Sequence, residues 1–500
     1  MKKIKKLLAM IMAMTMVLGM AMTVSAANPV EIQVSGAGEN AKFQWLQLIK
    51  PDPTQETGWA FTDESIRQNF SDAFDRNSSQ DLIWMLLLNQ DETIEIPDWV
   101  NVQPATDSQI AKALANVRNG DYTLEGPNST ITVDDAGMYY IMGDEEGYTY
   151  SPMAAYVSFR YNDNGEVADE LYCAGVVAKK VPNDVEIPKS GESKHKLTEI
   201  DRTETFTVGP AVVPYIYTDA DKEYFVRDTI TGGEYVTVES GEHEGEVELT
   251  VIVGRDTKTF YGTVTNEAPA EDGRVKQSFE ANLSSILEGN KYANQDITIT
   301  YQAVVKDVKV GNTVTVGDAE GDTSFGHGDT ELYTATINLL KYASDNDNDN
   351  LSDNKKLAGA EFIVYKVVEE AGTTKTYYAV ANGNEFTNWT TDKEKATHLI
   401  SNEDGKVSLS GLGAGTYWFE EVKAPTGYSL NGERKSVEVK TTEDLEDVLV
   451  LTPINFLNDK LAALPSTGGI GTTIFTIGGC AIMIAAAALY FVNRRKSEEN

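Results

Sequence analysis

One predicted strand of the chain ends its apolar stripe in a carboxylate. The stretch "TYWFEEVKAPTGYSL" (416–430) opens with aromatic residues that favour a pleated, half-buried surface, and Ala424-Pro425-Thr426-Gly427 then ends it with turn chemistry. Side chains alternate between the two faces of a strand. If Tyr417 and Phe419 point inward, Glu421 points inward with them. The sequence therefore predicts a carboxylate that is aimed at an apolar core.

Two further strand-like runs show the same pattern with other polar residues. The run "ATINLLKYA" ends one apolar face in Lys341, and the run "TPINFLND" ends one in Asn458. The apolar residues on these faces are Ile337 and Leu339 in the first run and Ile454 and Phe456 in the second. Each polar residue alone has an ordinary explanation, because a polar group at a strand end is usually solvated. Found together in one region, Lys341, Glu421 and Asn458 suggest a shared site.

Lysine, glutamate and asparagine side chains can react with one another where water is excluded. Burial favours the neutral, nucleophilic amine of a lysine and the protonated acid of a glutamate. A neutral amine held against an asparagine side-chain carbonyl can attack that carbonyl, and the acid can polarise it and shuttle protons as ammonia leaves. The expected product is an amide bond between two side chains, formed once per molecule.

The residues around Glu421 resemble a known motif. The pattern Tyr417-x-Phe419-x-Glu421-Val422-x-Ala424-Pro425-x-Gly427-Tyr428 resembles the E-box, Y-x-L-x-E-T-x-A-P-x-G-Y, of Gram-positive pilins, with Phe for Leu and Val for Thr. The stretches "KLAGAEFIVYK" and "DGKVSLSGLGAGTYWFEE" match the Cna-type B domain around it. This resemblance covers about 334–460. It implies that Lys341 and Asn458 form an isopeptide bond and that Glu421 is the promoting acid.

The middle of the chain, about 191–333, resembles the fimbrial isopeptide-formation domain more loosely. In "YFVRDTITGGEYVTV", Asp228 corresponds to the promoting acid, and in "VGNTVTV", Asn312 lies on an apolar face. The bonded lysine should come early in the domain. Alternation does not decide between Lys194 and Lys196, and we favour Lys196. The alternative is a middle domain without any such bond.

The C-terminal region carries a sorting signal. Leu464-Pro465-Ser466-Thr467-Gly468 matches the L-P-x-T-G signal of Gram-positive surface proteins and precedes an apolar segment over 470–492, which is long enough to span a bilayer. The basic run Arg494-Arg495-Lys496 follows and is expected to stay inside. By this resemblance, a sortase cuts between Thr467 and Gly468 and passes the Thr467 carbonyl to an amine.

The N-terminal region has the features of a secretory signal peptide. A basic start, an apolar run from Leu7 and small residues at Val24-Ser25-Ala26 predict removal of residues 1–26, with cleavage after Ala27 as the alternative. The protein is therefore expected outside the cell, on the wall of a Gram-positive bacterium.

A fibre also needs an amine that accepts the Thr467 carbonyl of the next subunit. The stretch "NDVEIPKSGESKHK" (183–196) resembles the pilin motif, whose core is Y-P-K, with Ile187 in the tyrosine position. This predicts Lys189 as an exposed acceptor. Lys179 and Lys180 are rival acceptors, and a solvated linker lysine is the alternative for Lys189.

One acidic stretch has spacings that a hard cation could use. In "SDNDNDNLSDNKK", weak calcium candidates are Asp345, Asp347, Asp349 and Asp353. Lys356 stands where an EF-hand would have its closing glutamate, so a solvated acidic loop is the favoured interpretation. We expect no cofactor.

The elements that must position these residues are mostly strands. Runs such as "ELTVIVG" and "DITITYQAVV", separated by Gly, Asn and Asp clusters, indicate a mainly β protein of tandem Ig-like or Cna-type β-sandwich domains. The helical spacings after Thr62-Asp63 and after Asp107 indicate helical insertions in the N-terminal domain. The predicted segments are 1–26 (signal peptide), 27–190 (N-terminal pilin domain), 191–333 (middle isopeptide-formation β-sandwich), 334–460 (C-terminal Cna-type B domain) and 464–500 (sorting signal, with a transmembrane helix over 470–492).

Composition and the absence of sequence motifs argue against several classes of partner and activity. The chain has 500 residues and a net charge of −35, which argues against nucleic acid as a partner. Cys480 lies in the C-terminal helix and is expected to leave with it. Cys173 is then alone, and no intramolecular disulfide can reinforce the protein. No CxxC, HExxH, P-loop or GxSxG pattern supports an enzyme.

The sequence thus predicts a structural backbone subunit of a covalently polymerised, cell-wall-anchored pilus, stabilised by Lys–Asn isopeptide bonds. The alternative is a singly anchored adhesin or ancillary pilin. The expected partners are a sortase, identical subunits, peptidoglycan and host surface ligands.

Overall fold

The computed structural model describes residues 28–167, 170–216, 223–320, 322–344, 355–461 and 471–497. The predicted signal peptide (1–26), the sorting motif Leu464–Gly468 and the weak calcium candidates Asp345, Asp347, Asp349 and Asp353 lie outside the described residues. The contacts divide the chain into two compact units, Met1–Thr334 with Thr441–Val448, and Ala335–Lys440 with Leu449–Asn500.

The prediction of a mainly β protein is confirmed, and helices occur where the N-terminal region was expected to have them. Among the described residues of the first unit, three α-helices occur: α2 (Glu64–Phe74), α3 (Ser79–Gln90) and α4 (Asp107–Arg118). Asp63, Ser78 and Thr106 cap their N-termini with side-chain acceptors. Sequence periodicity found α2 and α4. It missed α3, since every residue from Leu82 to Leu88 is buried and the helix has no polar face to set the period.

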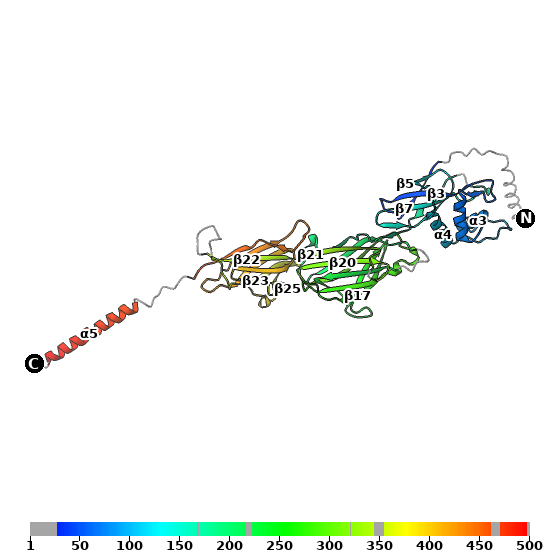
Figure 1. Cartoon of the computed structure of the whole chain (residues 1–500). Coiled ribbons are helices and arrows are strands. Elements are labelled where there is room, and N and C mark those ends of the chain that lie inside the picture. The colour runs from blue at the N-terminus through cyan, green and yellow to red at the C-terminus, as the bar shows by residue number, and fades with distance from the viewer. Residues whose placement is uncertain are drawn as a thin grey trace. The chain divides into compact units, whose positions relative to one another are not determined.

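A five-stranded sheet packs against these helices. Its order is β4-β3-β7-β9, with β5 also paired to β3. Alternation along β7 sends Met138 and Tyr140 into the core that the helices cover, while Tyr139 and Ile141 enter a second core on the opposite face. Figure 1 shows α3 and α4 beside β3 and β7. The strands of this region are β1 (Val30–Ile32), β2 (Val34–Ser35), β3 (Lys42–Pro51), β4 (Trp59–Phe61), β5 (Glu125–Asn128), β6 (Ile131–Val133), β7 (Gly137–Asp144), β8 (Tyr148–Tyr150), β9 (Met153–Val157), β10 (Val176–Val177) and β11 (Lys180–Pro182).

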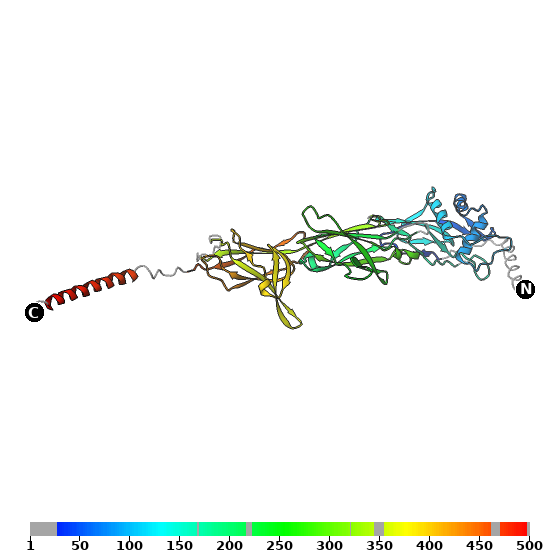
Figure 2. The ribbon, with the colours of Figure 1, turned by 90° about the horizontal axis from the view of Figure 1, so that it is seen from below.

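The rest of the first unit is a ten-stranded sheet, drawn mainly in green in Figures 1 and 2. Its order is β12-β13-β19-β16-β17-β18-β14-β20-β21, with β15 also paired to β19. The strands are β12 (Lys189–Gly191), β13 (Thr203–Val212), β14 (Phe225–Thr231), β15 (Gly233–Tyr235), β16 (Glu246–Val253), β17 (Asp256–Asn266), β18 (Lys276–Asn282), β19 (Asp296–Val305), β20 (Lys309–Gly317) and β21 (Gly326–Tyr333), and the short 3-10 helices are η2 (Lys194–Lys196), η3 (Ser284–Ile286) and η4 (Glu288–Asn290). The predicted domain boundary after residue 190 falls inside β12. Because β12 pairs with β13, Lys189 belongs to this sheet and not to a linker.

The second unit joins its first strand to its last. Strand β22 pairs antiparallel with β27 and parallel with β30 and β31, whereas β28 pairs with β23 and β29. The strands are β22 (Ala335–Ala343), β23 (Glu361–Glu370), β24 (Thr373–Asn382), β25 (Glu385–Thr390), β26 (Leu399–Ile400), β27 (Lys406–Leu412), β28 (Gly415–Lys423), β29 (Arg434–Val439), β30 (Leu449–Val450) and β31 (Ile454–Asn458), with the 3-10 helix η6 (Lys393–Lys395). Phe362 of β23 and Phe456 of β31 meet edge to face, with ring centroids 5.1 Å apart, and so join the two groups of strands through one core.

The C-terminal apolar segment is helical, as predicted. Helix α5 (Gly471–Ser497) contains Ile474–Arg495, a stretch of 22 residues that is long and apolar enough to cross a membrane by length and composition. This helix appears in red in Figure 1.

Candidate functional site

The structure brings Lys341, Glu421 and Asn458 together in the core of the second unit. The Glu421 carboxylate accepts hydrogen bonds from the Asn458 side-chain nitrogen at 2.9 and 3.0 Å, and its Oε1 lies 3.2 Å from Lys341 Nζ. Lys341 Nζ also donates to Asn458 Oδ1. The lysine and glutamate side chains are fully buried. Amine, amide and carboxylate are thus in mutual contact and shielded from water.

Strand register explains why these side chains meet. In the parallel pair of β22 and β31, Lys341 lies opposite Phe456, and Ala343 lies opposite Asn458. The lysine therefore runs along an apolar wall, with its Nζ 4.4 Å from the Phe456 ring centroid and 5.8 Å from that of Phe362. The pattern of apolar stripes ending in polar residues therefore places the three side chains at one point.

The surroundings increase the fraction of Lys341 that is neutral. Burial lowers the pKa of Lys341 to about 8, and the positive charge of Lys435 contributes in the same direction, while the Glu421 carboxylate opposes the shift. With that pKa, about one amine in ten is unprotonated at pH 7. A neutral amine in hydrogen-bond contact with an amide is arranged for attack on the amide carbon.

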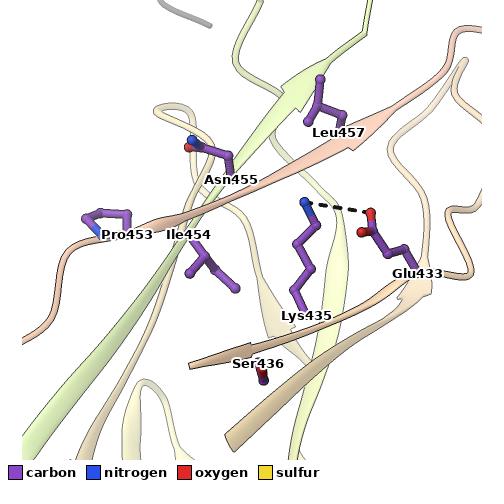
Figure 3. Close-up of a pocket in the computed structure, with 7 residues that line it drawn as sticks. All are labelled: Glu433, Lys435, Ser436, Pro453, Ile454, Asn455 and Leu457. Atoms are coloured by element: carbon purple, nitrogen blue, oxygen red, sulfur yellow. Dashed lines mark ion pairs between the residues drawn. The ribbon is translucent and has the colours of Figure 1, made fainter. Parts of the chain in front are cut away.

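A surface hollow lies beside this site, between β29 and β31 (Figure 3). Its lining includes Lys435, which pairs with Glu433 at 3.7 Å, together with Pro453, Ile454 and Leu457. Lys435 Nζ lies 5.9 Å from the Phe456 ring, the ring against which Lys341 also packs. Among the described residues that line the hollow, Glu433 is the one carboxylate.

A second buried cluster lies in the ten-stranded sheet, and it corrects a prediction. Lys189 Nζ donates to Asp228 Oδ2 and to the Tyr301 hydroxyl, the latter at 2.9 Å, and the lysine and aspartate side chains are fully buried. Asn312 is hydrogen-bonded to the same hydroxyl. The prediction that Lys189 is exposed is wrong, because β12 carries its side chain into the core beside Asp228.

The lysines predicted to face Asp228 lie elsewhere. Lys194 and Lys196 belong to the 3-10 helix η2, where Lys194 is exposed and Lys196 has a left-handed φ of 59°. Lys196 lies near Glu331, whose pKa is lowered mainly by hydrogen bonds from Lys309 and Tyr333 and, to a smaller extent, by the charge of Lys196. The structure does not bring Lys194 or Lys196 into the cluster around Asp228, and Lys189 occupies the place predicted for Lys196.

A signal for Lys189 was present in the sequence. Ile187 and Lys189 are two residues apart, and both are buried on the same side of Pro188, as the alternation rule requires for one strand face. The resemblance to a pilin motif predicts a linker here, whereas alternation across Pro188 predicts that Lys189 is buried with Ile187.

Burial also favours the neutral form of Lys189. It lowers the pKa of this lysine, and the Asp228 carboxylate opposes the shift. Asp228 accepts hydrogen bonds from two phenols, from Tyr235 at its Oδ1 and from Tyr301 at its Oδ2, both at 2.7 Å. The sequence reasoning did not include either tyrosine.

The two rival acceptor lysines differ in their surroundings. Lys180 is buried, forms an ion pair with Glu145 at 3.1 Å, and lies 4.0 Å from the ring centroid of Tyr148. Lys179 is half-buried, and its Nζ lies 5.5 Å from the Tyr215 ring centroid. Burial lowers the pKa of Lys179, and the charge of Asp107 opposes the shift. Lys179 thus combines partial access with an amine that loses its proton more readily than an ordinary lysine.

Among the described residues, no group of three or more His, Cys, Asp or Glu side chains could hold a metal ion. The acidic stretch that contains the calcium candidates is outside these residues, so the calcium hypothesis stays a prediction.

Two family models match parts of the chain. Residues 346–450 match a prealbumin-like fold domain (SpaA), and residues 457–499 match the LPXTG cell wall anchor motif. The chain therefore carries a prealbumin-like domain, which includes the strand of Glu421, and a wall-anchoring signal that marks a Gram-positive surface protein.

A curated relative and several solved structures are also similar. The trypsin-resistant surface T6 protein of Streptococcus pyogenes serotype M6 is 25% identical over 285 residues, which are 51% of this chain and 48% of that protein. The chain thus matches about half the length of this curated relative. The solved T6 backbone pilin of S. pyogenes is 15% identical over 82% of this chain and 79% of that chain, with a TM-score of 0.38. The full-length major pilin SpaD of Corynebacterium diphtheriae is 15% identical over 86% of this chain and 94% of that chain, with a TM-score of 0.40.

Proposed function

We propose that this protein is a structural backbone subunit of a covalently polymerised pilus on a Gram-positive cell wall. The observation that carries the proposal is the buried contact of Lys341, Glu421 and Asn458, which links the first and last strands of a domain just ahead of a wall anchor. The T6 relative is described as a trypsin-resistant surface protein and as a backbone pilin, and internal cross-links would give this chain the same resistance.

The chemistry at the second unit follows from the contacts. The neutral Lys341 amine attacks the Asn458 side-chain carbon, and a new C–N bond forms. The amine gives a proton to Glu421, whose oxygens both face Asn458 Nδ2, and Glu421 passes a proton to that nitrogen. The Asn458 C–N bond then breaks, and ammonia leaves. The products are one isopeptide bond and one ammonia, and Glu421 returns to its starting state.

The middle site supports a second bond, between Lys189 and Asn312 with Asp228 as the promoting acid. Here Lys189 replaces Lys196, which was the predicted partner. Together the two sites contain the amine, the amide and the acid that each bond requires.

Such bonds suit a fibre that carries load. Strands β22 and β31 are the first and last strands of the domain and run parallel, so a pull on the two ends of the domain slides one strand past the other and shears their hydrogen bonds. A side-chain amide between them would carry this force instead. The loop that the bond closes spans 117 residues in sequence. By analogy with a disulfide, this closure stabilises the fold by roughly 4–5 kcal/mol. Unlike a disulfide, the amide cannot be broken by a reductant.

For polymerisation we propose Lys179 as the amine that receives the Thr467 carbonyl of the next subunit. Lys189 and Lys180 are both buried, the former against Asp228 and the latter against Glu145. Lys179 is more accessible, and its lowered pKa increases the fraction of nucleophilic amine. The carbonyl donor and the amine acceptor then lie far apart in the sequence, as a head-to-tail fibre requires.

The direct test is a search for linked peptides in protein from the native host. Digestion of the full chain and tandem mass spectrometry should give peptides joined through Lys341–Asn458 and through Lys189–Asn312. The absence of both would reject the isopeptide chemistry. Linked peptides without covalent multimers in wall extracts would favour the singly anchored adhesin.

A further inference from the structure

The hydroxyl of Tyr301 lies at the centre of the middle cluster. It is 2.7 Å from Asp228 Oδ2, 2.9 Å from Lys189 Nζ, and 3.1 and 3.4 Å from Asn312 Nδ2 and Oδ1. Within the part of the chain that the structure describes, the Asn312 side chain makes its hydrogen bonds with this hydroxyl alone. Asp228 therefore reaches the asparagine through Tyr301.

The cluster in the second unit is built differently. There the Glu421 carboxylate accepts two hydrogen bonds directly from Asn458 Nδ2. A glutamate is one methylene longer than an aspartate. A shorter acid on β14 leaves a gap before the amide, and the phenol on β19 fills it. In the second unit the acid contacts the amide directly, whereas in the ten-stranded sheet a phenol connects the acid to the amide.

We propose that Tyr301 is a catalytic residue in the formation of the Lys189–Asn312 bond, and that its hydroxyl relays a proton from Asp228 to the leaving nitrogen of Asn312. This role rests on the proposed function, since it requires that the bond forms.

The hydrogen bonds join the groups that the relay connects, and two of them reverse as the proton moves. The Tyr301 oxygen accepts from Lys189 Nζ and from Asn312 Nδ2, and its proton is donated to Asp228 Oδ2. As Lys189 Nζ forms its bond to the Asn312 side-chain carbon, the nitrogen loses a proton to Asp228. Once Asp228 holds the proton from Lys189 it donates to the Tyr301 oxygen, and the Tyr301 hydroxyl turns to donate to Asn312 Nδ2, whose lone pair becomes available in the tetrahedral intermediate. The phenol gives its own proton to Asn312 Nδ2 and takes the one held by Asp228. The bond from carbon to Nδ2 then breaks, ammonia leaves, and both Tyr301 and Asp228 end as they began.

The phenol is held in place and keeps its proton until it is needed. The Tyr301 ring stacks on Phe206 with centroids 5.8 Å apart, and it meets Phe279 edge to face at 5.0 Å. Burial, with the nearby Asp228 charge, raises the pKa of Tyr301 well above its usual range, so the resting group is a neutral O–H donor. A fixed and protonated phenol requires little reorganisation during the reaction.

The chain offers a matched control. Tyr235 also donates to Asp228, at Oδ1 and 2.7 Å, and its ring packs against that of Tyr301 with centroids 5.9 Å apart. It makes no hydrogen bond to Asn312, whose bonds all go to Tyr301. Tyr235→Phe and Tyr301→Phe therefore each remove one phenol oxygen that is hydrogen-bonded to Asp228. Only Tyr301→Phe also removes the hydrogen bond to Asn312.

The test is a pulse-label experiment on the full chain. After labelling, cells are sampled over time, the protein is digested, and the peptide linked through Lys189 and Asn312 is quantified against its unlinked parts. The peptide linked through Lys341 and Asn458 is measured in the same samples as an internal check on folding. We expect Tyr301→Phe to slow the middle bond by about 100-fold or more, the range for loss of general acid–base catalysis. Tyr235→Phe should stay within a few-fold of the wild type.

A second measurement separates chemistry from folding. Unlinked Tyr301→Phe should unfold at the same temperature as unlinked Asp228→Ala or at a higher one, because both lack the bond and Tyr301→Phe loses a single oxygen. A lower temperature for Tyr301→Phe would indicate a damaged fold and overturn the relay. The proposal is also overturned if Tyr301→Phe forms the bond at the wild-type rate, or if both tyrosine variants slow it equally. If the wild-type chain gives no linked peptide, the Lys189–Asn312 bond does not form. That result would contradict the proposed function and not the role of Tyr301 alone.

Discussion

A lysine that is taken out of water and set against an amide changes from a surface charge into a reactant. Lys341 and Lys189 are both fully buried, each touches a buried carboxylate, and burial lowers the pKa of each. An unreacted buried ion pair gives little net stability, because desolvation offsets the attraction between the charges. A reaction that consumes the amine and the amide gives a physical reason for retaining such groups.

Glu421→Ala should leave the Lys341–Asn458 bond unformed, because both Glu421 oxygens contact the nitrogen that must leave. The intact mass should rise by one ammonia, after allowance for the substitution itself. The unfolding temperature of the second unit should fall by roughly 10–20 °C, from the loss of about 4–5 kcal/mol of loop-closure stabilisation. Glu420→Ala, on the outer face of the same strand, is the matched control and should keep the bond. If the Lys341–Asn458 bond forms at the normal rate in Glu421→Ala, Glu421 is not the promoting acid.

The depressed pKa of Lys341 predicts how stability depends on pH when the bond cannot form. In Asn458→Ala the amine stays free, with a folded-state pKa of about 8 against 10.5 for an ordinary lysine. Between these values the unfolded chain binds more protons than the folded one, so stability should rise as the pH increases from about 8 to 10.5. Thermal unfolding across this range would measure the effect. The double variant Lys341→Met/Asn458→Ala lacks the amine and should not show this rise, and equal pH slopes in the two variants would contradict the assignment.

At the scale of elements, both sites place the lysine on the first strand of a domain. Strand β22 opens the second unit, and β12 opens the ten-stranded sheet. In the second unit the partner amide lies on the last strand, β31, in parallel register with β22. In the ten-stranded sheet it lies on β20, next to the strand that carries Asp228. A covalent bond from the first strand to a late strand would keep the end strands of the domain from separating when the chain is pulled or begins to unfold.

Substitution of lysines around β12 should identify the partner of Asn312. Lys189→Ala should abolish the linked middle peptide, because this amine contacts Asp228 and the hydroxyl that is bonded to Asn312. Lys196→Ala and Lys194→Ala should leave that peptide unchanged, since both residues lie in η2. Tandem mass spectrometry of the digested full chain gives the answer. A linked peptide that persists in Lys189→Ala and disappears in Lys196→Ala would restore the original prediction.

At the scale of the whole molecule, a fibre subunit needs one carbonyl donor and one amine acceptor besides its internal bonds. The anchor motif within 457–499 supplies the donor, and the first unit contains the proposed acceptor. In the proposed function, internal cross-linking and polymerisation require different lysines, because an amine buried against a carboxylate can reach an internal amide but not a sortase.

Lys179→Ala should convert a ladder of covalent multimers into a monomer that is still attached to the wall. The reason is that Lys179 combines partial exposure with a lowered pKa in the first unit. Wall extracts from the native host, boiled in denaturant and separated by size, provide the measurement. Lys42→Ala, which removes an exposed lysine from β3, is the control and should keep the ladder. A ladder that survives Lys179→Ala would point to Lys180 or another acceptor.

The sequence by itself determined the mainly β class, the presence of the helices α2 and α4, the C-terminal apolar helix and the Lys341, Glu421 and Asn458 constellation. These features follow from local periodicity, because alternation along a strand or a helical stripe shows which face is buried. Tertiary structure decided what local pattern could not. Helix α3 is buried on all sides and has no stripe. Lys189 sits beside a proline in a stretch that reads as a linker, and only the pairing of β12 with β13 carries it to Asp228. Tyr301 is one of 23 tyrosines in the chain, and nothing in its neighbours marks it. Asp228 is 73 residues away from it in the sequence. Asn312 is only 11 residues away, but its strand β20 pairs with β14 and not with β19, so the position of Tyr301 between acid and amide arises only when the sheet is assembled.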